Sequence, residues 1–298
     1  MARRWYGGDT QLTVRMFLVM FLLAALYLGF IALLWASGMD FFGVALIAAA
    51  LLGVQYYFSD RIVLWSMGAQ EVTPEQAPQL HATIERLCAL ADLPKPRVAI
   101  VNTSLPNAFA TGRSPSAAVV AVTSGLMERL EQPEVEAVLA HELSHVRNRD
   151  VAVMTLASFF ATLAQLLMRS FMWRGVYGGN RRNGGAAAVM LIYLASLAVW
   201  VISFFLIRAL SRYRELAADR GAAIITGAPS QLSSALLKIS GTMQRIPTRD
   251  LREVEAMNAF FIVPALTGDA LTELFSTHPS LERRLEQLKR LEQDMEGR

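Results

Sequence analysis

Long uncharged stretches alternate with charged ones along this chain. Residues 16–36 contain no charged side chain over 21 positions, and residues 41–58 contain none over 18. About 20 apolar residues in an α-helix span the roughly 30 Å hydrocarbon core of a bilayer. Because a short turn separates the two stretches, they predict a transmembrane hairpin within residues 1–59. A signal peptide does not fit, since its apolar core has only about 7 to 15 residues.

Two more apolar stretches occur in the second half of the chain. Residues 151–168 and 186–207 carry no charge over about 18 and 22 positions, which predicts a second pair of helices within residues 151–210. Two full crossings would place the arginines of their connection outside, against the positive-inside bias. Either the first hairpin dominates the topology, or the second pair is shallow or packed within an assembly. These arginines are Arg169, Arg174, Arg181 and Arg182.

The arginines around the first hairpin predict its orientation. Arg3, Arg4 and Arg15 precede the first helix and Arg61 follows the second, whereas the connecting turn carries only Asp40. Segments on the cytoplasmic side of a membrane are enriched in Arg and Lys. Both ends of the hairpin, and the polar segment that follows it, are therefore expected in the cytoplasm.

Residues 60–150 have the mixed pattern of a water-exposed domain. Thr73, Pro74 and Gln76 form a capping-box pattern, which predicts a helix that opens there and runs to about residue 91. His81 lies on this helix and is expected to be an ordinary surface or half-buried histidine.

Short β-branched stretches follow that helix. Residues 97–101 and 117–123 are typical of strands. Residues 106–112 between them are either a loop or the edge strand of a small sheet. An exposed edge strand can bind an extended peptide by main-chain hydrogen bonds, so the choice between the two affects the functional interpretation.

The composition agrees with a membrane protein. Of 298 residues, 54% are hydrophobic and 18% are charged, which is too apolar for an ordinary soluble domain. The net charge of +3 is small and no basic block is interleaved with aromatic residues, so nothing favours nucleic acid as a partner. The single cysteine, Cys88, cannot form an internal disulfide and is expected to be a helix residue that packs in the hydrophobic core.

The strongest chemical signal in the chain is His141-Glu142-Leu143-Ser144-His145. Pro133 and Glu134 favour the start of a helix ahead of it. On a helix, residues four positions apart share one face, so the two imidazoles suit one zinc ion. Glu142 then points beside the metal, where it can reach a zinc-bound water without being a ligand.

A catalytic zinc has three protein ligands and an open position for water, so this motif needs one more ligand. Glu215 and Asp219 lie one turn apart on a stretch that favours a helix, just after the fourth apolar segment. Glu215 is the expected third ligand. Asp219 is expected to accept a hydrogen bond from the outer nitrogen of a ligand histidine. The alternative is that both carboxylates lie on a solvated helix face.

His278 is the remaining candidate for the site. Pro279 follows it and favours a turn or extended backbone, which places this imidazole on a loop. Three roles are open: a zinc ligand in place of Glu215, a donor to the oxyanion that forms when water adds to a carbonyl, or a structural turn residue. We expect the oxyanion donor.

These motifs together resemble those of the HtpX family of membrane zinc metalloproteases, which are relatives of the CAAX prenyl proteases. The resemblance covers nearly the whole chain. It implies His141, His145 and Glu215 as zinc ligands and Glu142 as the catalytic base. The motifs that carry it are residues 141–150, Arg214-Glu215 with Ala218-Asp219, Thr277-His278-Pro279, and Asn107-Ala108-Phe109.

The resemblance also implies how substrates bind and what they are. It suggests a substrate-binding strand at Asn107, Ala108 and Phe109. The family is associated with the degradation of misfolded or damaged membrane proteins at the bacterial inner membrane, in quality control and the stress response. The expected partners are therefore polypeptide substrates and the lipid bilayer, while the oligomeric state stays open.

The expected fold is α+β and mainly helical, a zincin-type (gluzincin) metalloprotease domain with a small β-sheet. Up to four transmembrane or membrane-associated helices accompany it. The domain is expected in two parts, residues 60–150 and 211–298, divided by the second apolar pair. The predicted function is a zinc-dependent endopeptidase in which Glu142 takes a proton from the zinc-activated water. The alternative is a non-catalytic, membrane-anchored zinc-binding scaffold or chaperone, which would need four protein ligands.

Overall fold

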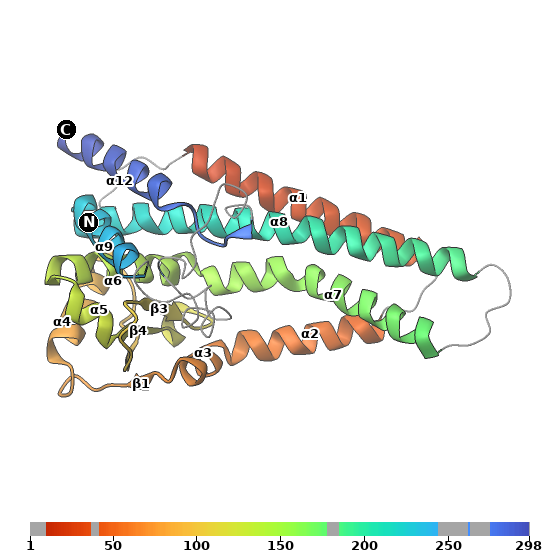
Figure 1. Ribbon diagram of the computed structural model, residues 1–298, viewed down its shortest axis with the longest axis horizontal. Helices are drawn as coiled ribbons and strands as arrows, with labels where there is room; N and C mark the ends of the chain where they lie inside the picture. The colour runs from red at the N-terminus through yellow and green to blue at the C-terminus, as the bar shows by residue number, and fades with distance from the viewer. Residues whose placement is uncertain (1–9, 37–41, 178–184, 244–261, 263–274, 298) are drawn as a thin grey trace. The chain divides into compact units, whose positions relative to one another are not determined.

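The computed structural model describes residues 10–36, 42–177, 185–243, 262 and 275–297, and for residues 170–177 and 185–189 it describes the backbone alone. The chain divides into two compact units, each described here by itself (Figure 1). The sheet unit contains Tyr56–Ala152 and Ser211–Arg298, and the helix unit contains Asp9–Gln55 and Val153–Leu210.

The apolar stretches form long helices, as predicted. They are α1 (Thr10–Ala36), α2 (Phe42–Tyr57), α7 (Asp150–Tyr177) and α8 (Gly185–Thr226). Three of the described helices are long and apolar enough to cross a membrane, and a fourth span results if α2 is combined with the short helix α3 (Ser59–Met67). The chain is therefore a membrane protein.

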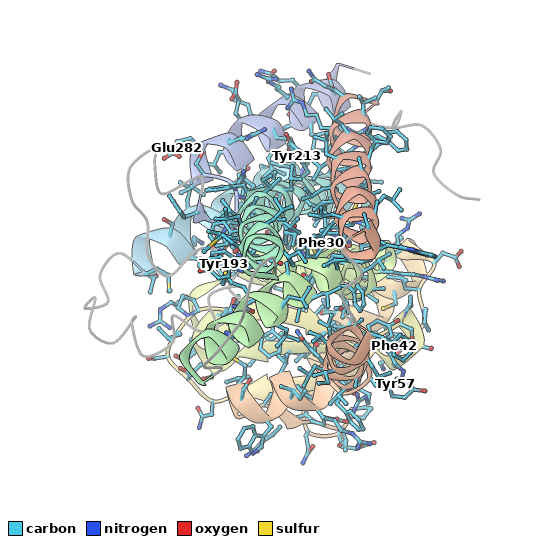
Figure 2. The ribbon with its side chains drawn as sticks, turned by 90° about the vertical axis from the view of Figure 1, so that its right-hand side faces the viewer. Phe30, Phe42, Tyr57, Tyr193, Tyr213 and Glu282 are labelled. Atoms are coloured by element: carbon cyan, nitrogen blue, oxygen red, sulfur yellow. The ribbon has the colours of Figure 1, made fainter. Side chains whose placement is uncertain are left out.

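Within the helix unit, α1 is buried along one stripe and exposes apolar side chains elsewhere. Phe30 on α1 is buried, whereas Phe42 at the start of α2 is 73% exposed (Figure 2). The hydroxyl of Tyr27 donates a 2.6 Å hydrogen bond to the carbonyl of Ala157, and its ring lies 4.6 Å from that of Phe160. These contacts join α1 to α7, while the exposed apolar surface suits lipid as its solvent.

The sheet unit contains a four-stranded mixed sheet of order β1-β2-β4-β3. Strands β2 and β4 are parallel, and β1 and β3 pair antiparallel to them at the two edges. Of the two predicted alternatives for residues 106–112, the edge strand is therefore the correct one. The strands are β1 (Gln70–Glu71), β2 (Arg97–Val101), β3 (Ala108–Thr111) and β4 (Val119–Thr123).

Helices cover both faces of this sheet because alternate side chains of a strand point to opposite faces. Val98, Val120 and Val122 face a core made with α4, α6, α9 and α12. Ala99 and Phe109 face the other side, where they contact α3. The helices of the first core are α4 (Pro78–Ala91), α6 (Gln132–Asn148), α9 (Pro229–Met243) and α12 (Leu281–Glu296), and α5 (Ser124–Arg129) follows β4.

The start of α4 corrects one prediction. The helix begins at Pro78 and not at the capping-box pattern of residues 73–76. The backbone N–H of Thr73 does donate to Oε1 of Gln76 over 2.8 Å, but this closes a turn. Ala77 precedes a proline, which disfavours the helical conformation, and it adopts φ −139° and ψ 63°. The helix therefore cannot extend back through Ala77.

Two side chains on α4 are part of the core. Cys88 is buried, as predicted. His81 is more buried than expected, with 8% of its surface exposed, and its Nε2 lies 3.0 Å from the carbonyl oxygen of Val72. This histidine therefore links α4 to the chain near β1 and takes no part in the site described below.

Candidate active site

The site is built on α6, whose start is fixed by side chains. The backbone N–H of Glu131 donates to Oε2 of Glu134 over 2.8 Å, which satisfies a donor at the helix start. Glu134 is buried and also accepts hydrogen bonds from Ser234 (2.6 Å) and Lys238 (2.8 Å) of α9. At the other end, Arg149 adopts the left-handed conformation with φ 55° and ends the helix. These contacts fix the helix that carries the two histidines.

The two histidines of α6 point their Nε2 atoms at one place. His141 and His145 lie four residues apart, and their Nε2 atoms are 3.1 Å from each other. The ring planes are at 85° to each other. His141 is fully buried, whereas the His145 side chain is 18% exposed. Such an arrangement of two ring nitrogens is expected for ligands of one ion.

Glu215 reaches this pair from α8. Its Oε1 lies 3.3 Å from Nε2 of His145, and its Oε2 lies 3.6 Å from Nε2 of His141. The close approach of α8 to α6 depends on Gly221, because a Cβ at that position would lie 2.4 Å from Oγ of Ser144. Only glycine at position 221 lets the two helix backbones come this close without displacing Ser144.

These three side chains fit a zinc ion. A tetrahedral zinc with bonds of about 2.0–2.1 Å holds its ligand atoms about 3.3–3.4 Å apart, and the separations here are 3.1, 3.3 and 3.6 Å. Among the described residues, none donates a hydrogen bond to the buried Oε2 of Glu215. This oxygen, with Nδ1 of His278 3.2 Å away, can bind a cation. Two imidazoles and one carboxylate also match the donor set of catalytic zinc sites.

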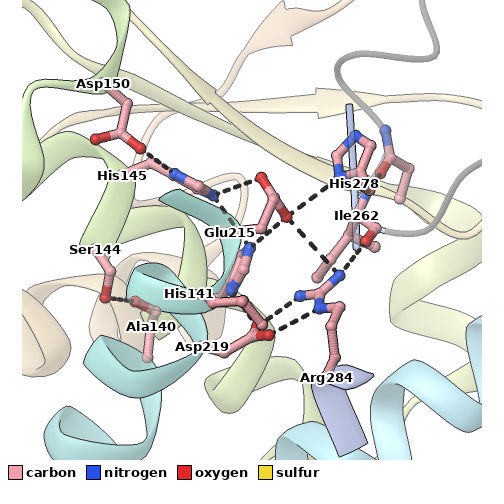
Figure 3. A network of polar contacts seen from close by, with 12 residues as sticks. Ala140, His141, Ser144, His145, Asp150, Glu215, Asp219, Ile262, His278 and Arg284 are labelled. Atoms are coloured by element: carbon pink, nitrogen blue, oxygen red, sulfur yellow. Dashed lines mark hydrogen bonds and ion pairs between the residues drawn. The ribbon is translucent and has the colours of Figure 1, made fainter. Parts of the chain in front are cut away.

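The outer nitrogen of each histidine faces a carboxylate (Figure 3). Nδ1 of His141 lies 2.9 Å from Oδ1 of Asp219, one turn after Glu215 on α8. Nδ1 of His145 lies 2.6 Å from Oδ2 of Asp150, just beyond α6. A carboxylate at Nδ1 holds the proton there and leaves Nε2 free for a metal.

Each of these carboxylates is in turn paired with an arginine. Arg284 of α12 donates to both oxygens of Asp219, over 2.8 and 2.6 Å, and to the carbonyl oxygen of Ile262. Arg214 of α8 pairs with Asp150. Asp219 keeps the pKa of Arg284 above its usual value although burial acts to lower it. Both histidines are thus oriented through a carboxylate that an arginine holds.

Glu142 lies on α6 between the two histidines and is 5% exposed. Burial raises the pKa of its carboxyl group, and the nearby Glu215 acts in the same direction, while the histidines and a hydrogen bond from the Ala110 backbone partly oppose this. A carboxylate with a raised pKa is a better proton acceptor near neutral pH. The contact with Ala110 places this carboxylate beside the edge strand β3.

His278 also lies at the site. Its Nδ1 is 3.2 Å from Oε2 of Glu215, and the ring is 5% exposed. The loop that carries it is connected to α8 by a 2.9 Å hydrogen bond from Arg212 to the carbonyl of Ser276. The structure thus brings His278 together with the α6 histidines and Glu215.

The three residues of the predicted substrate-binding strand occupy different places. Ala108 and Phe109 belong to β3, which has no further strand on its outer side among the described residues. Asn107 precedes β3 and is 1% exposed, and its Oδ1 accepts a 3.0 Å hydrogen bond from the backbone of Ile262. Phe109 faces α3. Their side chains are thus part of the core, and what β3 can offer to a ligand is its backbone.

Sequence reasoning missed the contributions of Asp150, Arg214 and Arg284. Asp150 follows His145 by only five residues, and this short spacing was a signal that its carboxylate could contact the outer nitrogen of His145. Arg284 had a signal of its own, because it precedes Leu288 and Leu291 by four and seven residues and so lies on the apolar face of α12. A charged residue on that face indicates a buried partner.

Comparison with known proteins identifies the family. Residues 74–292 match peptidase family M48. The chain is 67% identical to the Protease HtpX homolog of Moorella thermoacetica over 297 residues, which are 99% of each chain. It is 56% identical to Protease HtpX homolog 2 of Methanosarcina acetivorans over 295 residues, covering 99% of this chain and 100% of the relative. The chain belongs to the HtpX proteases of peptidase family M48.

Membership of family M48 makes the chain a metalloendopeptidase, and its substrates are polypeptides. Among the described residues, the side chains that are placed to hold a metal ion together are those of His141, His145 and Glu215. The fold is also similar to the crystal structure of S. mikatae Ste24p, with a TM-score of 0.57 and 18% sequence identity over 94% of this chain and 67% of that one. This likeness supports the predicted α+β metalloprotease fold.

Proposed function

We propose that this M48 protease uses zinc, with His141, His145 and Glu215 as ligands, to hydrolyse peptide bonds in misfolded or damaged membrane proteins. The observation that carries the proposal is the triangle of two Nε2 atoms and one carboxylate, whose sides of 3.1, 3.3 and 3.6 Å match a tetrahedral zinc. Zinc bound there would lower the pKa of a water molecule and polarise the peptide carbonyl.

The chain's own residues then carry the proton transfers. Glu142 accepts the proton of the attacking water and delivers it to the departing amine. Asp219 and Asp150 hold the protons of the two histidines at Nδ1, which keeps both Nε2 atoms available. His278, 3.2 Å from Oε2 of Glu215, donates a hydrogen bond to the oxygen that gains negative charge.

The edge strand β3 binds the substrate. An extended peptide can pair with the outer side of β3 by main-chain hydrogen bonds. Because the Ala110 backbone contacts Glu142, a peptide bound along β3 passes the proposed base. This binding mode selects extended, unfolded chains and excludes folded ones.

The arginine distribution supports a cytoplasmic active site at the bacterial inner membrane. Arg15 lies near the start of α1 and Arg61 follows α2, at the ends of the two helices opposite to their connection. The sheet unit follows Arg61 in the chain. The proteolytic site is therefore proposed to act on the cytoplasmic side.

Replacing Glu142 tests the proposal. Glu142→Gln should keep the metal content of the wild type and reduce cleavage of an unfolded test protein by about 10²–10⁴-fold. His141→Ala should lose both metal and cleavage. Glu136→Gln is the control, because it removes the same charge from α6 at a residue that pairs with Arg86. It should leave metal content and cleavage unchanged. Wild-type cleavage by pure Glu142→Gln protein would contradict the proposed mechanism.

A further inference from the structure

Helix α3 exposes an apolar face on the sheet unit. Its inner face, with Val63 and Leu64, packs on the sheet. On its other face, Ile62 and Trp65 are 47% and 86% exposed, and Phe58, which directly precedes the helix, is 42% exposed. Their spacing of four and three residues places them on one stripe of a helix. Large apolar side chains on a continuous stripe mark a surface that binds something apolar.

Arginines and aromatic rings meet at the start of α3. The guanidinium of Arg113, from the β3–β4 connection, lies 4.6 Å from the ring centre of Tyr57, and the hydroxyl of Tyr56 donates a 2.8 Å hydrogen bond to the Arg113 carbonyl. Arg61 lies 5.8 Å from the ring centre of Phe58. Tyr57 is exposed (Figure 2).

The charge on this face is positive because the acidic residue of α3 points inward. Asp60 is 8% exposed and pairs with Arg97 of β2. The outer face of α3 therefore presents aromatic and aliphatic side chains with Arg61. Aromatic rings together with arginine are typical of residues at the lipid–water boundary on the cytoplasmic side of a membrane.

The length of α2 indicates what covers this face. With 16 residues, α2 rises about 24 Å, slightly less than the roughly 30 Å of a hydrocarbon core. A 65° bend separates α2 from α3, which begins two residues after the last residue of α2. Because α3 does not continue the axis of α2, the chain leaves α2 near the lipid–water boundary. We propose that the outer face of α3 lies in this boundary, with Phe58, Ile62 and Trp65 in contact with lipid and Arg61 at the level of the phosphates.

This position has a consequence for substrates, which rests on the proposed function. The inner face of α3 contacts Phe109 of β3, and Arg113 follows the end of β3 by two residues. A helix fixed at the bilayer surface thus holds the proposed substrate-binding strand next to that surface. The preferred substrates are then polypeptides tethered to the bilayer, cut close to the point where they leave it.

Spin labels on introduced cysteines test where α3 lies. Burial raises the pKa of the only cysteine, Cys88, to about 11, so an introduced exposed cysteine reacts selectively near neutral pH. The label is placed at Ile62→Cys, with Leu90→Cys and Leu237→Cys as controls, because these leucines are 51% and 53% exposed in the same unit.

In anionic lipid nanodiscs, the label at position 62 should collide more often with oxygen, which concentrates in lipid, than with a water-soluble nickel complex. The labels at positions 90 and 237 should show the reverse. Equal access of the nickel complex to all three positions would overturn the proposal. This readout needs no protease activity, so it is independent of the proposed function.

Cleavage assays test the consequence for substrates. The double variant Ile62→Ser and Trp65→Ser should cut a bilayer-tethered peptide several-fold more slowly than the wild type and a soluble unfolded protein at the wild-type rate. An unchanged rate on the tethered peptide would overturn the link between α3 and substrate choice. If wild-type protein cut neither substrate, the proposed function would fail while the spin-label result would stand.

Discussion

The two histidines of the site are held by contacts of different kinds. The contact to His141 is closed: Asp219 is 0% exposed, and Arg284, which binds both of its oxygens, is 2% exposed. The contact to His145 is more open: the Asp150 side chain is 12% exposed, and the His145 side chain 18%. Water can therefore replace part of the Asp150 contact, while it cannot reach Asp219.

The two contacts also differ in their distance along the chain. Asp150 follows His145 by five residues, across the end of α6. His141 depends on α8 and α12, because Asp219 and Arg284 are 65 residues apart. In the open contact the histidine and its carboxylate lie in one short segment and only Arg214 comes from a distant helix, whereas the closed contact joins residues of three helices. Mutations that affect the two contacts should therefore differ in their effect on zinc affinity and on folding.

Removing the arginine of the closed contact should have the largest effect. Arg284→Gln leaves the Asp219 carboxylate buried without its cation, which should cost about 3–5 kcal/mol of the free energy of unfolding. It should also reduce zinc affinity by about 10–100-fold, since His141 loses its oriented partner. Zinc affinity is measured by competition with a chelating dye, and unfolding by thermal denaturation in detergent.

Arg290→Gln is the matched control on the same helix. The Arg290 side chain is 72% exposed and pairs with Glu286, and exposed pairs contribute little to stability. If Arg284→Gln behaved like Arg290→Gln in both measurements, α12 would have no part in the metal site.

Removing one charge from each carboxylate compares the two contacts directly. Asp219→Asn should weaken zinc binding by about 10–100-fold. Asp150→Asn should weaken it less, because His145 is partly exposed and water can accept its Nδ1–H. The zinc dissociation rate of each purified variant is the measurement. A larger loss for Asp150→Asn would reverse the ranking of the two contacts.

The closed contact also depends on how near α8 comes to α6. Gly221→Ala adds a Cβ that would lie 2.4 Å from Oγ of Ser144, and such overpacking typically costs about 1–3 kcal/mol. We expect a lower unfolding temperature and weaker zinc binding. Adding Ser144→Gly removes the clashing side chain and should restore zinc binding. No rescue by the second substitution would show that the spacing of the two helices is not what matters.

The ion pair between the buried Glu134, near the start of α6, and the partly exposed Lys238 should affect stability alone. Burial acts to raise the pKa of Glu134, but hydrogen bonds from Lys238 and Ser234 outweigh it and lower the pKa. This stabilisation is present above the usual carboxyl pKa of 4.5 and is lost as the pH falls through the lower folded value. Glu134→Gln should therefore unfold at a lower temperature than the wild type at pH 7, with a difference that shrinks below pH 4.5.

The same variant sharpens the comparison of the two histidine contacts. Glu134→Gln should bind zinc as the wild type does, since none of its contacts reaches His141 or His145. A clear loss of zinc affinity would mean that any disturbance of α6 weakens the site, and the specific roles of Asp219 and Asp150 would no longer be needed.

Short-range patterns in the sequence predicted much of this molecule. The apolar stretches became helices, residues 97–101 became β2, and the spacing of His141 and His145 put both Nε2 atoms together, because each depends on neighbours a few residues away. The predicted start of α4 was wrong, because Pro78 disfavours the helical conformation at Ala77 and this restriction outweighed the capping pattern.

Contacts between distant segments were harder to predict. The sequence predicted a helix that carries Glu215 and Asp219 to the site. It did not predict that Asp219 binds Arg284, which lies 65 residues later on another helix. The packing that joins α8 to α12 is set by tertiary contacts, such as the 2.7 Å hydrogen bond from Gln287 to the carbonyl of Leu216. Such contacts leave only a weak trace in the sequence, here an arginine on an apolar helix face.

X-ray absorption spectroscopy of the zinc-loaded protein tests the central claim most directly, because it counts the imidazoles bound to the metal. The account predicts one zinc per chain with two imidazoles and oxygen ligands, unchanged imidazole scattering in His278→Ala, and loss of the bound zinc in Glu215→Ala. Three imidazoles in the wild type, falling to two in His278→Ala while Glu215→Ala keeps its zinc, would contradict it.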